Sequence, residues 1–529
     1  MLSPDPRLRR PAVAFALERG LVPVDRLFNR LYTSRFSPVY QSGTLAIVCL
    51  LVLIATGLYT LIFYRIGAPY ESVQALEEQW WGGRWIRALH TYAADAMLIF
   101  AGVHMLRMAI QGRTWGPRAL AWISGAFLLA SLFFSGWTGM VLVWDRQGQL
   151  LATEGARILD ILPVFSEPIQ RGFVSGTGVA APFFFLNLLI HIVVPLWLAA
   201  IVWLHTLRVT KPAIFPPRQL AVWLVAALAL LAVVWPVGHM PKASFSVMQG
   251  VVPLDLFFNF WVIPGRHLPP QATLGAWVAA FAGLASMPWW WRPRRRGELA
   301  PAAGDENLCT GCGQCYLDCP FGAIAMVPAP ATNTATLLVA RVNPALCVSC
   351  GICAGACAPM VIGPPGRAGR DLLLEAQAFW ERARPGTADV AVLACAQGLG
   401  VLRAPGPAAG VHWLGLHCAA ASHTSAIEYL IRRGTGGVYV LACPERDCAF
   451  RFGPRWIRER LFNDREAELR ERVDKSRVRV GSFGKADAVQ AVAEIRSFRA
   501  EIAARAAERS GEEHVEVEGE CEPLEAIRV

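Results

Sequence analysis

Two pairs of histidines inside long apolar segments limit the possible folds of this chain most strongly. His90 and His104 lie fourteen residues apart, and so do His191 and His205. On an α-helix, fourteen residues rise about 21 Å and turn about 1400°, close to four full turns. Each pair therefore faces one way at two depths. Because an ionisable side chain is costly within a membrane and imidazole is a good axial ligand of haem iron, the spacing predicts two haems.

Glycines repeat the same spacing in two flanking apolar segments. Gly43 and Gly57 lie fourteen residues apart, as do Gly125 and Gly139. A flat macrocycle between helices needs positions without side chains, and glycine supplies them. Ordinary packing is the alternative, with small residues that let helices approach closely and histidines that fill the core. That alternative does not account for the shared period.

The composition indicates a membrane protein with a large soluble part. Hydrophobic residues make up 54% of the 529 residues, and this length suggests about three or four domains. Six apolar runs are each close to the ~20 residues that a membrane-spanning helix needs. The predicted spans are residues 44–64, 88–110, 119–143, 182–207, 219–237 and 272–291. The first begins too late, behind too many arginines, for a cleavable signal peptide.

The basic residues predict how these spans are oriented. Arg and Lys concentrate in residues 1–40, in the second and fourth connections, and after the sixth span. The acidic residues of the opposite loops are Glu71, Glu77, Glu78, Asp145, Glu154 and Asp160. The positive-inside rule then places a basic amphipathic N-terminal segment and the C-terminal half in the cytoplasm of a prokaryote, with the protein in the inner membrane. The net charge of +10 reflects membrane electrostatics, and we predict no nucleic-acid site.

Short motifs surround the histidines and glycines. They are Gly43 to Gly57, Arg87-Ala-Leu-His90, His104-Met-Leu-Arg107, Gly139-Met-Val-Leu-Val-Trp144 and His191-Ile-Val-Val-Pro195 continuing to His205. Through them residues 41–265 resemble the cytochrome b subunit of quinol-oxidising respiratory and photosynthetic complexes. The resemblance implies a dihaem bundle over residues 41–292, with His90 and His191 on the outer haem and His104 and His205 on the inner one. It also implies that Arg87 and Arg107 face haem propionates; simple interfacial arginines are the alternative.

The quinone sites of that family are altered in this sequence. The outer Pro-Glu-Trp-Tyr motif corresponds to Pro253-Leu-Asp255-Leu256. The carboxylate of Asp255 therefore lies one position later than the glutamate of the motif. Thr210 replaces a second inner histidine. The resemblance still implies quinone or quinol as a bound molecule. Asp255 and Glu154 are the candidate catalytic residues.

A linker of residues 293–306 leads to a domain of residues 307–366 that contains two runs of cysteines. The runs are Cys309, Cys312, Cys315 and Cys319, then Cys347, Cys350, Cys353 and Cys357. This spacing is typical of two-cluster ferredoxins, in which the fourth cysteine of each run binds the other 4Fe-4S cluster. We therefore predict a first set of Cys309, Cys312, Cys315 and Cys357, and a second set of Cys347, Cys350, Cys353 and Cys319. Zinc and disulfides are the disfavoured alternatives.

Residues 371–510 alternate short β runs with helical stretches, which predicts a parallel sheet. Cys395, Cys418 and Cys443 each follow a predicted strand, and Cys448 lies in the next loop. Ligands gather at the carboxyl ends of parallel strands, so these four thiols are candidate ligands of a 2Fe-2S cluster. Zinc binding and simple burial remain alternatives.

Three motifs in this region are Cys395-Ala-Gln-Gly398, His417-Cys418 and Cys443-Pro-Glu-Arg-Asp-Cys448. They resemble the iron–sulfur delta subunit of methyl-viologen-reducing hydrogenases, whose first motif usually has a second cysteine where Gly398 stands. The resemblance implies a cytoplasmic redox partner. This partner would be a flavoprotein, a heterodisulfide-reductase-like protein or a hydrogenase-like protein. Residues 511–529 are rich in Glu and predict a disordered acidic tail.

The sequence thus predicts a multidomain chain with an all-α transmembrane bundle, a ferredoxin-like domain and an α/β parallel-sheet domain. We expect a subunit of a quinone-linked oxidoreductase, in contact with membrane lipid and assembled as a homodimer or larger complex. In it the protein positions and tunes cofactors that exchange electrons between a cytoplasmic donor and the quinone pool. One alternative is a docking subunit whose C-terminal domain recruits a partner without conducting electrons. The other is the cytochrome b of a variant complex with a Rieske or cytochrome c partner on the outer face.

Overall fold

The computed structural model describes residues 8–9, 12–163, 169, 173, 181–207, 213–246, 251–253, 255, 257–291, 294–295, 300–396, 409–463 and 465–519. The chain divides into two compact units. One comprises residues 38–292, and the other comprises residues 1–37 together with residues 293–529.

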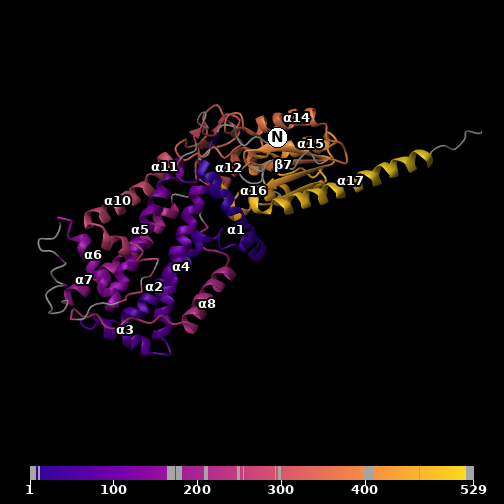
Figure 1. Cartoon of the computed structure of the whole chain (residues 1–529). Helices are drawn as coiled ribbons and strands as arrows, with labels where there is room; N and C mark the ends of the chain where they lie inside the picture. The colour runs from indigo at the N-terminus through magenta and orange to yellow at the C-terminus, as the bar shows by residue number, and fades with distance from the viewer. Residues whose placement is uncertain are drawn as a thin grey trace, which may run out of the picture. The chain divides into compact units, whose positions relative to one another are not determined.

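The unit of residues 38–292 is helical throughout its described secondary structure (Figure 1). Its helices are α2 Ser42–Phe63, α3 Pro69–Glu78, α4 Gly83–Ile110, η1 Gly116–Arg118, α5 Ala119–Val141, α6 Arg146–Leu159, α7 Ala181–Leu207, α8 Arg218–Val234, α9 Val262–His267, α10 Pro270–Ala285 and α11 Met287–Trp290. Helix α4 packs along α2, and α7 packs along α5. These are the two most extensive helix pairs of the unit.

Four helices among the described residues are long and apolar enough to cross a membrane, namely α2, α4, α5 and the Ala181–Thr206 part of α7. The fifth and sixth predicted spans are shorter, because α8 has 17 residues and α10 has 16. Proline explains the difference. Pro236 follows the end of α8, and Pro288 follows the end of α10, and proline disfavours helix continuation. Where six full-length spans were expected, the described residues thus contain four long apolar helices and one shorter apolar helix, α8.

The outward surfaces of these helices are apolar. Leu58 on α2, Leu196 on α7 and Leu230 on α8 are each more than half exposed. Exposed apolar area on this scale is rare on proteins that are surrounded by water. This arrangement is that of a membrane protein, with lipid as the solvent of the helices.

In the second unit, the two cysteine runs have the same local geometry. Helix α12 Gln314–Asp318 and helix α13 Ile352–Ala356 each begin after a glycine, Gly313 or Gly351, with a positive φ. Glycine adopts this left-handed conformation without strain. Strands β3 Ala303–Gly304 and β6 Ile362–Gly363 pair antiparallel, as do β4 Ile324–Pro328 and β5 Leu338–Val342.

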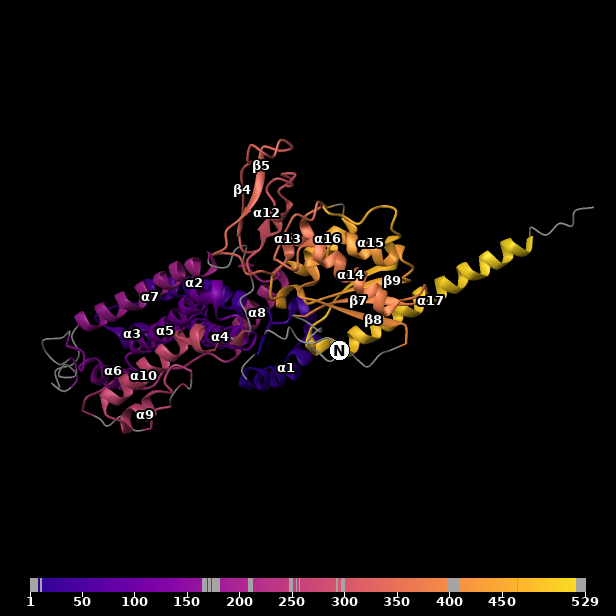
Figure 2. The ribbon, with the colours of Figure 1, turned by 90° about the horizontal axis from the view of Figure 1, so that it is seen from above.

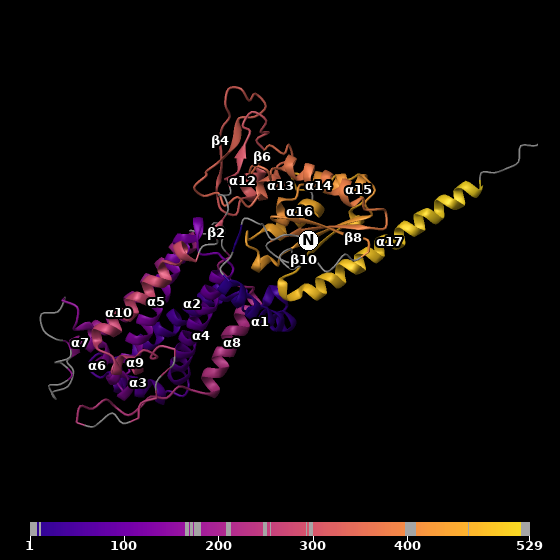
Figure 3. The ribbon, with the colours of Figure 1, turned by 45° about the horizontal axis from the view of Figure 1, so that its top comes forward.

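The C-terminal domain confirms the predicted parallel sheet. Its strands are β7 Val390–Cys395, β8 Val411–Leu416, β9 Gly437–Ala442 and β10 Val478–Ser482, in the order β10-β9-β7-β8. The side chains of α14 Gly369–Ala383, α15 Thr424–Arg432 and α16 Gly453–Phe462 pack on one face. Helix α17 Ala488–Gly519 packs on the other (Figures 2 and 3). The domain is thus a helix–sheet–helix sandwich.

The two ends of the chain differ from the sequence expectation. Helix α17 continues to Gly519, so residues 511–519, expected to be disordered, are helical, and residues 520–529 lie outside the described residues. Glu is a good helix former, which accounts for the extension. Helix α1, Ala12–Phe36, belongs to the same unit as the C-terminal domain. Its Glu18 forms an ion pair with Lys485, and its Asn29 donates to the carboxylate of Asp487 at 3.1 Å.

Candidate haem and iron–sulfur sites

The histidines meet between two helices. His90 and His104 lie on α4, and His191 and His205 lie on α7. The ring centroids of His90 and His191 are 6.5 Å apart. An iron bound by two imidazoles needs roughly 6 Å between ring centroids, since each metal–nitrogen bond is about 2 Å long and each centroid lies about 1 Å behind its nitrogen. His104 is close enough to His205 for their charges to interact. The residues therefore fit the pairing that the resemblance implies.

Each of the four glycines lies against one histidine ring. The pairs are Gly43 with His104, Gly57 with His90, Gly125 with His205 and Gly139 with His191. A Cβ atom added to Gly43 would lie 2.8 Å from Nδ1 of His104, and one added to Gly139 would lie 2.8 Å from Cε1 of His191. Such contacts are too short to tolerate. The glycines therefore make room for the imidazole rings themselves, in addition to any macrocycle.

A hydroxyl residue precedes each glycine, a feature that the sequence reasoning missed. The four are Ser42, Thr56, Ser124 and Thr138. Thr56 Oγ1 lies 2.9 Å from Nδ1 of His90. Ser124 Oγ lies 2.9 Å from Nδ1 of His205. The signal that could have revealed them is the fourteen-residue period, which they share with the glycines.

These contacts determine which imidazole nitrogen is free for iron. The Thr56 hydroxyl donates its hydrogen to the carbonyl oxygen of Val52 at 2.7 Å, so its oxygen can accept from Nδ1–H of His90. Nδ1 of His191 lies 3.2 Å from Thr138 Oγ1 and 3.1 Å from the carbonyl oxygen of Ser135, which can only accept. Nδ1 therefore carries the proton, and Nε2 keeps the lone pair that a metal ligand needs.

The two arginines assigned to propionates have protein partners. Arg87 forms an ion pair with Glu77 and donates to the carbonyl oxygen of Val237 at 2.7 Å. The guanidinium of Arg107 is buried and lies 4.3 Å from the centroid of the Tyr40 ring. Their propionate contacts remain predictions.

The two candidate catalytic carboxylates lie in different settings. Glu154, on α6, forms ion pairs with Arg157 at 3.1 Å and Arg266 at 3.5 Å, and its catalytic role stays a prediction. Oδ1 of Asp255 accepts from the backbone N–H of Phe257 at 2.6 Å. Asp255 is also close enough to Asp95 for the two charges to interact. Asp95 lies on α4 between the two histidines, and sequence reasoning missed it although a carboxylate inside an apolar span is a strong signal.

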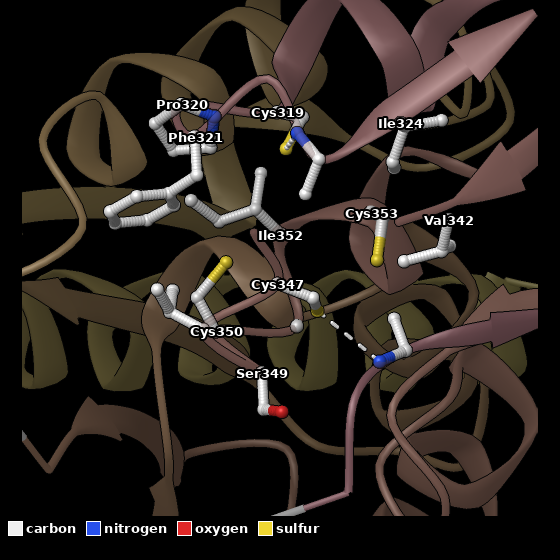
Figure 4. Close-up of a pocket in the computed structure, with 14 residues that line it drawn as sticks. Cys319, Pro320, Phe321, Ile324, Val342, Cys347, Ser349, Cys350, Ile352 and Cys353 are labelled. Atoms are coloured by element: carbon white, nitrogen blue, oxygen red, sulfur yellow. Dashed lines mark hydrogen bonds between the residues drawn. The ribbon is translucent and has the colours of Figure 1, made fainter. Parts of the chain in front are cut away.

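The eight ferredoxin cysteines line two separate pockets. Figure 4 shows the pocket around Cys319, Cys347, Cys350 and Cys353, with their sulfur atoms directed toward a common space. The other pocket is lined by Cys309, Cys312, Cys315 and Cys357. Each pocket thus takes three cysteines from one run and one from the other, the arrangement that the spacing predicts. Thr210 and Gly398, where the family motifs are altered, lie outside the described residues.

The donor chemistry of these pockets fits iron–sulfur clusters. Backbone N–H groups of Ala302 and Ala323 donate to the sulfur atoms of Cys347 and Cys319, both at 3.3 Å. Burial raises the pKa of the Cys315 and Cys350 thiols to about 12. A bound cationic centre would compensate the charge of such thiolates. Soft thiolate sets with N–H···S bonds are those that hold iron–sulfur clusters.

Four further cysteines converge at the carboxyl edge of the parallel sheet. The sulfur atoms of Cys395 and Cys443 are 3.8 Å apart, whereas a disulfide needs about 2.05 Å. A Cβ added to Gly453 would lie 3.4 Å from the sulfur of Cys448 and 3.5 Å from that of Cys418. A hydrogen bond with the Cys395 thiol and burial raise the pKa of Cys418. No group of three or more His, Cys, Asp or Glu among the described residues is arranged around a single metal-ion position.

Comparison with known proteins assigns three successive regions. Residues 27–213 match the family described as cytochrome b/b6/petB. Residues 308–360 match the 4Fe-4S dicluster domain, and residues 390–504 match the delta subunit of methyl-viologen-reducing hydrogenase. The fold and these matches define a class, a membrane protein in which a haem-binding region precedes iron–sulfur domains.

The N-terminal region is similar in sequence to cytochrome b6. It is 29% identical over 184 residues to cytochrome b6 of Auxenochlorella protothecoides, covering 34% of this chain and 84% of that protein. A solved structure described as a hyperthermophilic respiratory Complex III aligns with a TM-score of 0.38 and 17% identity, over 52% of this chain and 82% of that chain. This chain thus has an N-terminal region similar to cytochrome b, followed by a region similar to 4Fe-4S dicluster domains.

Proposed function

We propose that this protein is the membrane subunit of a quinone-linked oxidoreductase that exchanges electrons between a cytoplasmic redox partner and the quinone pool. The observation that carries the proposal is that one core contains cysteines of two redox domains. Cys350 of the ferredoxin domain lies in the same hydrophobic core as Cys395, Cys418, Cys443 and Cys448 of the C-terminal domain. A domain that served only for docking would not need its thiols next to a ferredoxin cysteine.

The proposal assigns a ligand set to each cofactor. His90 with His191 and His104 with His205 would hold two b haems, and the two ferredoxin pockets would hold two 4Fe-4S clusters. The four C-terminal cysteines would hold a 2Fe-2S cluster. When bound, these groups supply one-electron chemistry, and the chain supplies their positions and surroundings.

Orientation and direction follow from charge. The arginines of residues 1–40 favour the cytoplasmic side for the N-terminus and for the iron–sulfur domains. With the inside negative, outward movement of electrons is favourable. It lowers their free energy by about 2.3 kcal/mol per charge for each 100 mV. We therefore propose flow from a cytoplasmic flavoprotein or hydrogenase-like donor toward quinone in a prokaryotic inner membrane.

Quinone chemistry also requires proton exchange, for which Asp95 and Asp255 are the proposed groups. Their proximity supports this proposal. Oδ1 of Asp95 is buried and has no hydrogen-bond partner among the described residues.

A docking function is the second candidate, because the first cysteine motif of the C-terminal domain has only Cys395. One substitution separates the two candidates. In the full chain, we expect Cys443→Ser to remove two irons and the accompanying inorganic sulfide. It should stop haem reduction by reduced flavodoxin, a soluble low-potential flavoprotein, while dithionite still reduces both haems.

The matched control is Cys49→Ser, which changes a buried cysteine of α2 and should alter neither the iron content nor the haem reduction. Unchanged iron content together with normal haem reduction in Cys443→Ser would establish docking instead.

A further inference from the structure

Arg460, on α16, is completely buried between the two iron–sulfur domains. Nη2 donates to Oδ2 of Asp318 at 2.9 Å, and both side chains are 0% exposed. Nη1 donates to the carbonyl oxygen of Ala420 at 2.7 Å, and Nη2 also reaches that of Ile352 at 3.3 Å. A fully buried ion pair carries a large desolvation cost, so it is weak evidence for stability alone. Its position suggests another role.

All three acceptors of Arg460 are next to cysteines. Asp318 precedes Cys319, and Ile352 precedes Cys353, so both adjoin the second ferredoxin set. Ala420 lies in the turn η4, Ala419–Ala421, that directly follows Cys418 of the C-terminal set. One planar guanidinium therefore holds the backbone beside ligands of two different cysteine sets.

The two sets are also packed tightly around this contact. A Cβ added to Gly355 would lie 2.4 Å from both the carbonyl oxygen of Ala420 and Nη1 of Arg460. A Cβ added to Gly351 would lie 3.0 Å from Cβ of Ala421. The Cys418 thiol is close enough to Cys350 for their charges to interact. The pocket of the first set, by contrast, is lined by residues between 304 and 362.

We propose that Arg460 is a positioning residue that locks the C-terminal four-cysteine set against the second ferredoxin set. The second set, which contains Cys319 and Cys353, is then the redox neighbour of the C-terminal domain, and the Cys309 set is the more distant one. This inference rests on the proposed function for the presence of the clusters. It adds which of the two ferredoxin sets adjoins the C-terminal domain.

The charge of Arg460 predicts a selective effect on reduction potential. Asp318 accepts from Arg460 and also from Arg465, so one carboxylate is shared by two guanidinium groups. Arg465 also pairs with Glu459, so the charges of this cluster balance while Arg460 is present. The positive charge of Arg460 beside the second set favours the reduced, more negative form of a group bound there. Removing it should lower that potential and leave the first set nearly unchanged.

The test is a redox titration of the full-length protein followed by electron paramagnetic resonance. In Arg460→Gln we expect a lower potential for one 4Fe-4S signal, the one that Cys347→Ser abolishes, and a weaker magnetic interaction between that signal and the C-terminal cluster. Arg460→Lys, which keeps the charge, should restore the potential more than the magnetic interaction. The matched control is Arg458→Gln on the same helix. Arg458 is 46% exposed and pairs with Glu445 at 3.6 Å, so its loss should change neither signal.

The inference is overturned if Arg460→Gln shifts both 4Fe-4S signals equally, shifts only the other one, or shifts neither. Should that variant fail to fold, Gly355→Ala tests the same contact between the two cysteine sets without a change of charge. We expect it to weaken the magnetic interaction with the C-terminal cluster, and an unchanged interaction overturns the inference. Its control is Gly283→Ala on α10, where an added Cβ meets no atom within 4 Å.

Metal analysis separates this inference from the proposed function. If the protein contains eight ferredoxin irons and no C-terminal cluster, the proposed function fails at that cluster. The shift caused by Arg460→Gln still decides the role of Arg460, because it is measured on the ferredoxin signals.

Discussion

At three of the four proposed haem ligands, His90, His191 and His205, a histidine, a glycine and a hydroxyl residue come together. The histidines and glycines can be predicted from the sequence because their fourteen-residue period is unusual. The hydroxyl residues share the period but are common in membrane helices, where they bond to their own backbone. Only their contact with Nδ1 of the imidazole distinguishes Thr56 and Ser124 from such residues. That contact depends on how α2 packs against α4 and how α5 packs against α7.

Removing one hydroxyl tests this arrangement. In Thr56→Val the side chain keeps nearly the same shape and loses the acceptor for Nδ1–H of His90. Loss of such a partner typically weakens metal binding about 10–100-fold, so we expect selective loss of the outer haem. Haem content and reduced-minus-oxidised spectra measure the result. Thr60→Val is the control, because that hydroxyl bonds to the carbonyl oxygen of Gly57. Equal loss of both haems in Thr56→Val would contradict the assignment.

At the scale of elements, four helices form the haem-binding region. Helix α4 and helix α7 supply the histidines, while α2 and α5 supply the glycines that face them. The sequence predicts these four helices well because each carries a long apolar run. It overestimates α8 and α10, where proline ends the helix early. It also cannot reveal Arg460, because that contact joins positions 142 residues apart and no local pattern marks it.

The helix arrangement predicts separable haems. Each iron should take one ligand from α4 and one from α7, so His104→Ala should remove the inner haem and leave the outer one. Haem stoichiometry falling from two to one, with one remaining spectral component, is the expected result. The control is His267→Ala, which changes an exposed histidine of α9. Loss of both haems from folded protein would count against the pairing.

For the whole molecule, the association of the chain's first helix with its last domain is unexpected from sequence. Helix α1 contacts the C-terminal domain near η7, Lys485–Asp487. The exposed apolar residues of α1 include Val13, Leu17, Val24, Leu27 and Leu31, which follow a helical spacing of three, four or seven residues. The amphipathic character of residues 12–36 could be predicted. The partner of its polar face could not be predicted, because charge patterns alone do not specify which distant carboxylate or ammonium group the helix contacts.

The association can be tested by changing its polar contacts. Lys485→Ala combined with Asp487→Ala removes the partners of Glu18 and Asn29. Each such pair is worth at most about 1 kcal/mol. We expect trypsin to cleave α1, at Arg26 and Arg30, faster by up to about 30-fold, the limit set by two such pairs, with iron content unchanged. Lys475→Ala in the turn η6, Lys475–Arg477, is the control. Unchanged cleavage rates would show that apolar packing alone holds α1.

This association also sets an order in time for biogenesis. Asn29 and Asp487 are 458 residues apart, so at about 5–20 residues per second of synthesis the helix waits roughly 20 to 90 s before its partner exists. During that interval the membrane segments are inserted while the polar contacts of α1 are unmade. The apolar stripe of the helix is suited to rest on the lipid surface in the meantime. The polar contacts of α1 with Lys485 and Asp487 can therefore form only after the membrane segments between them have been synthesised.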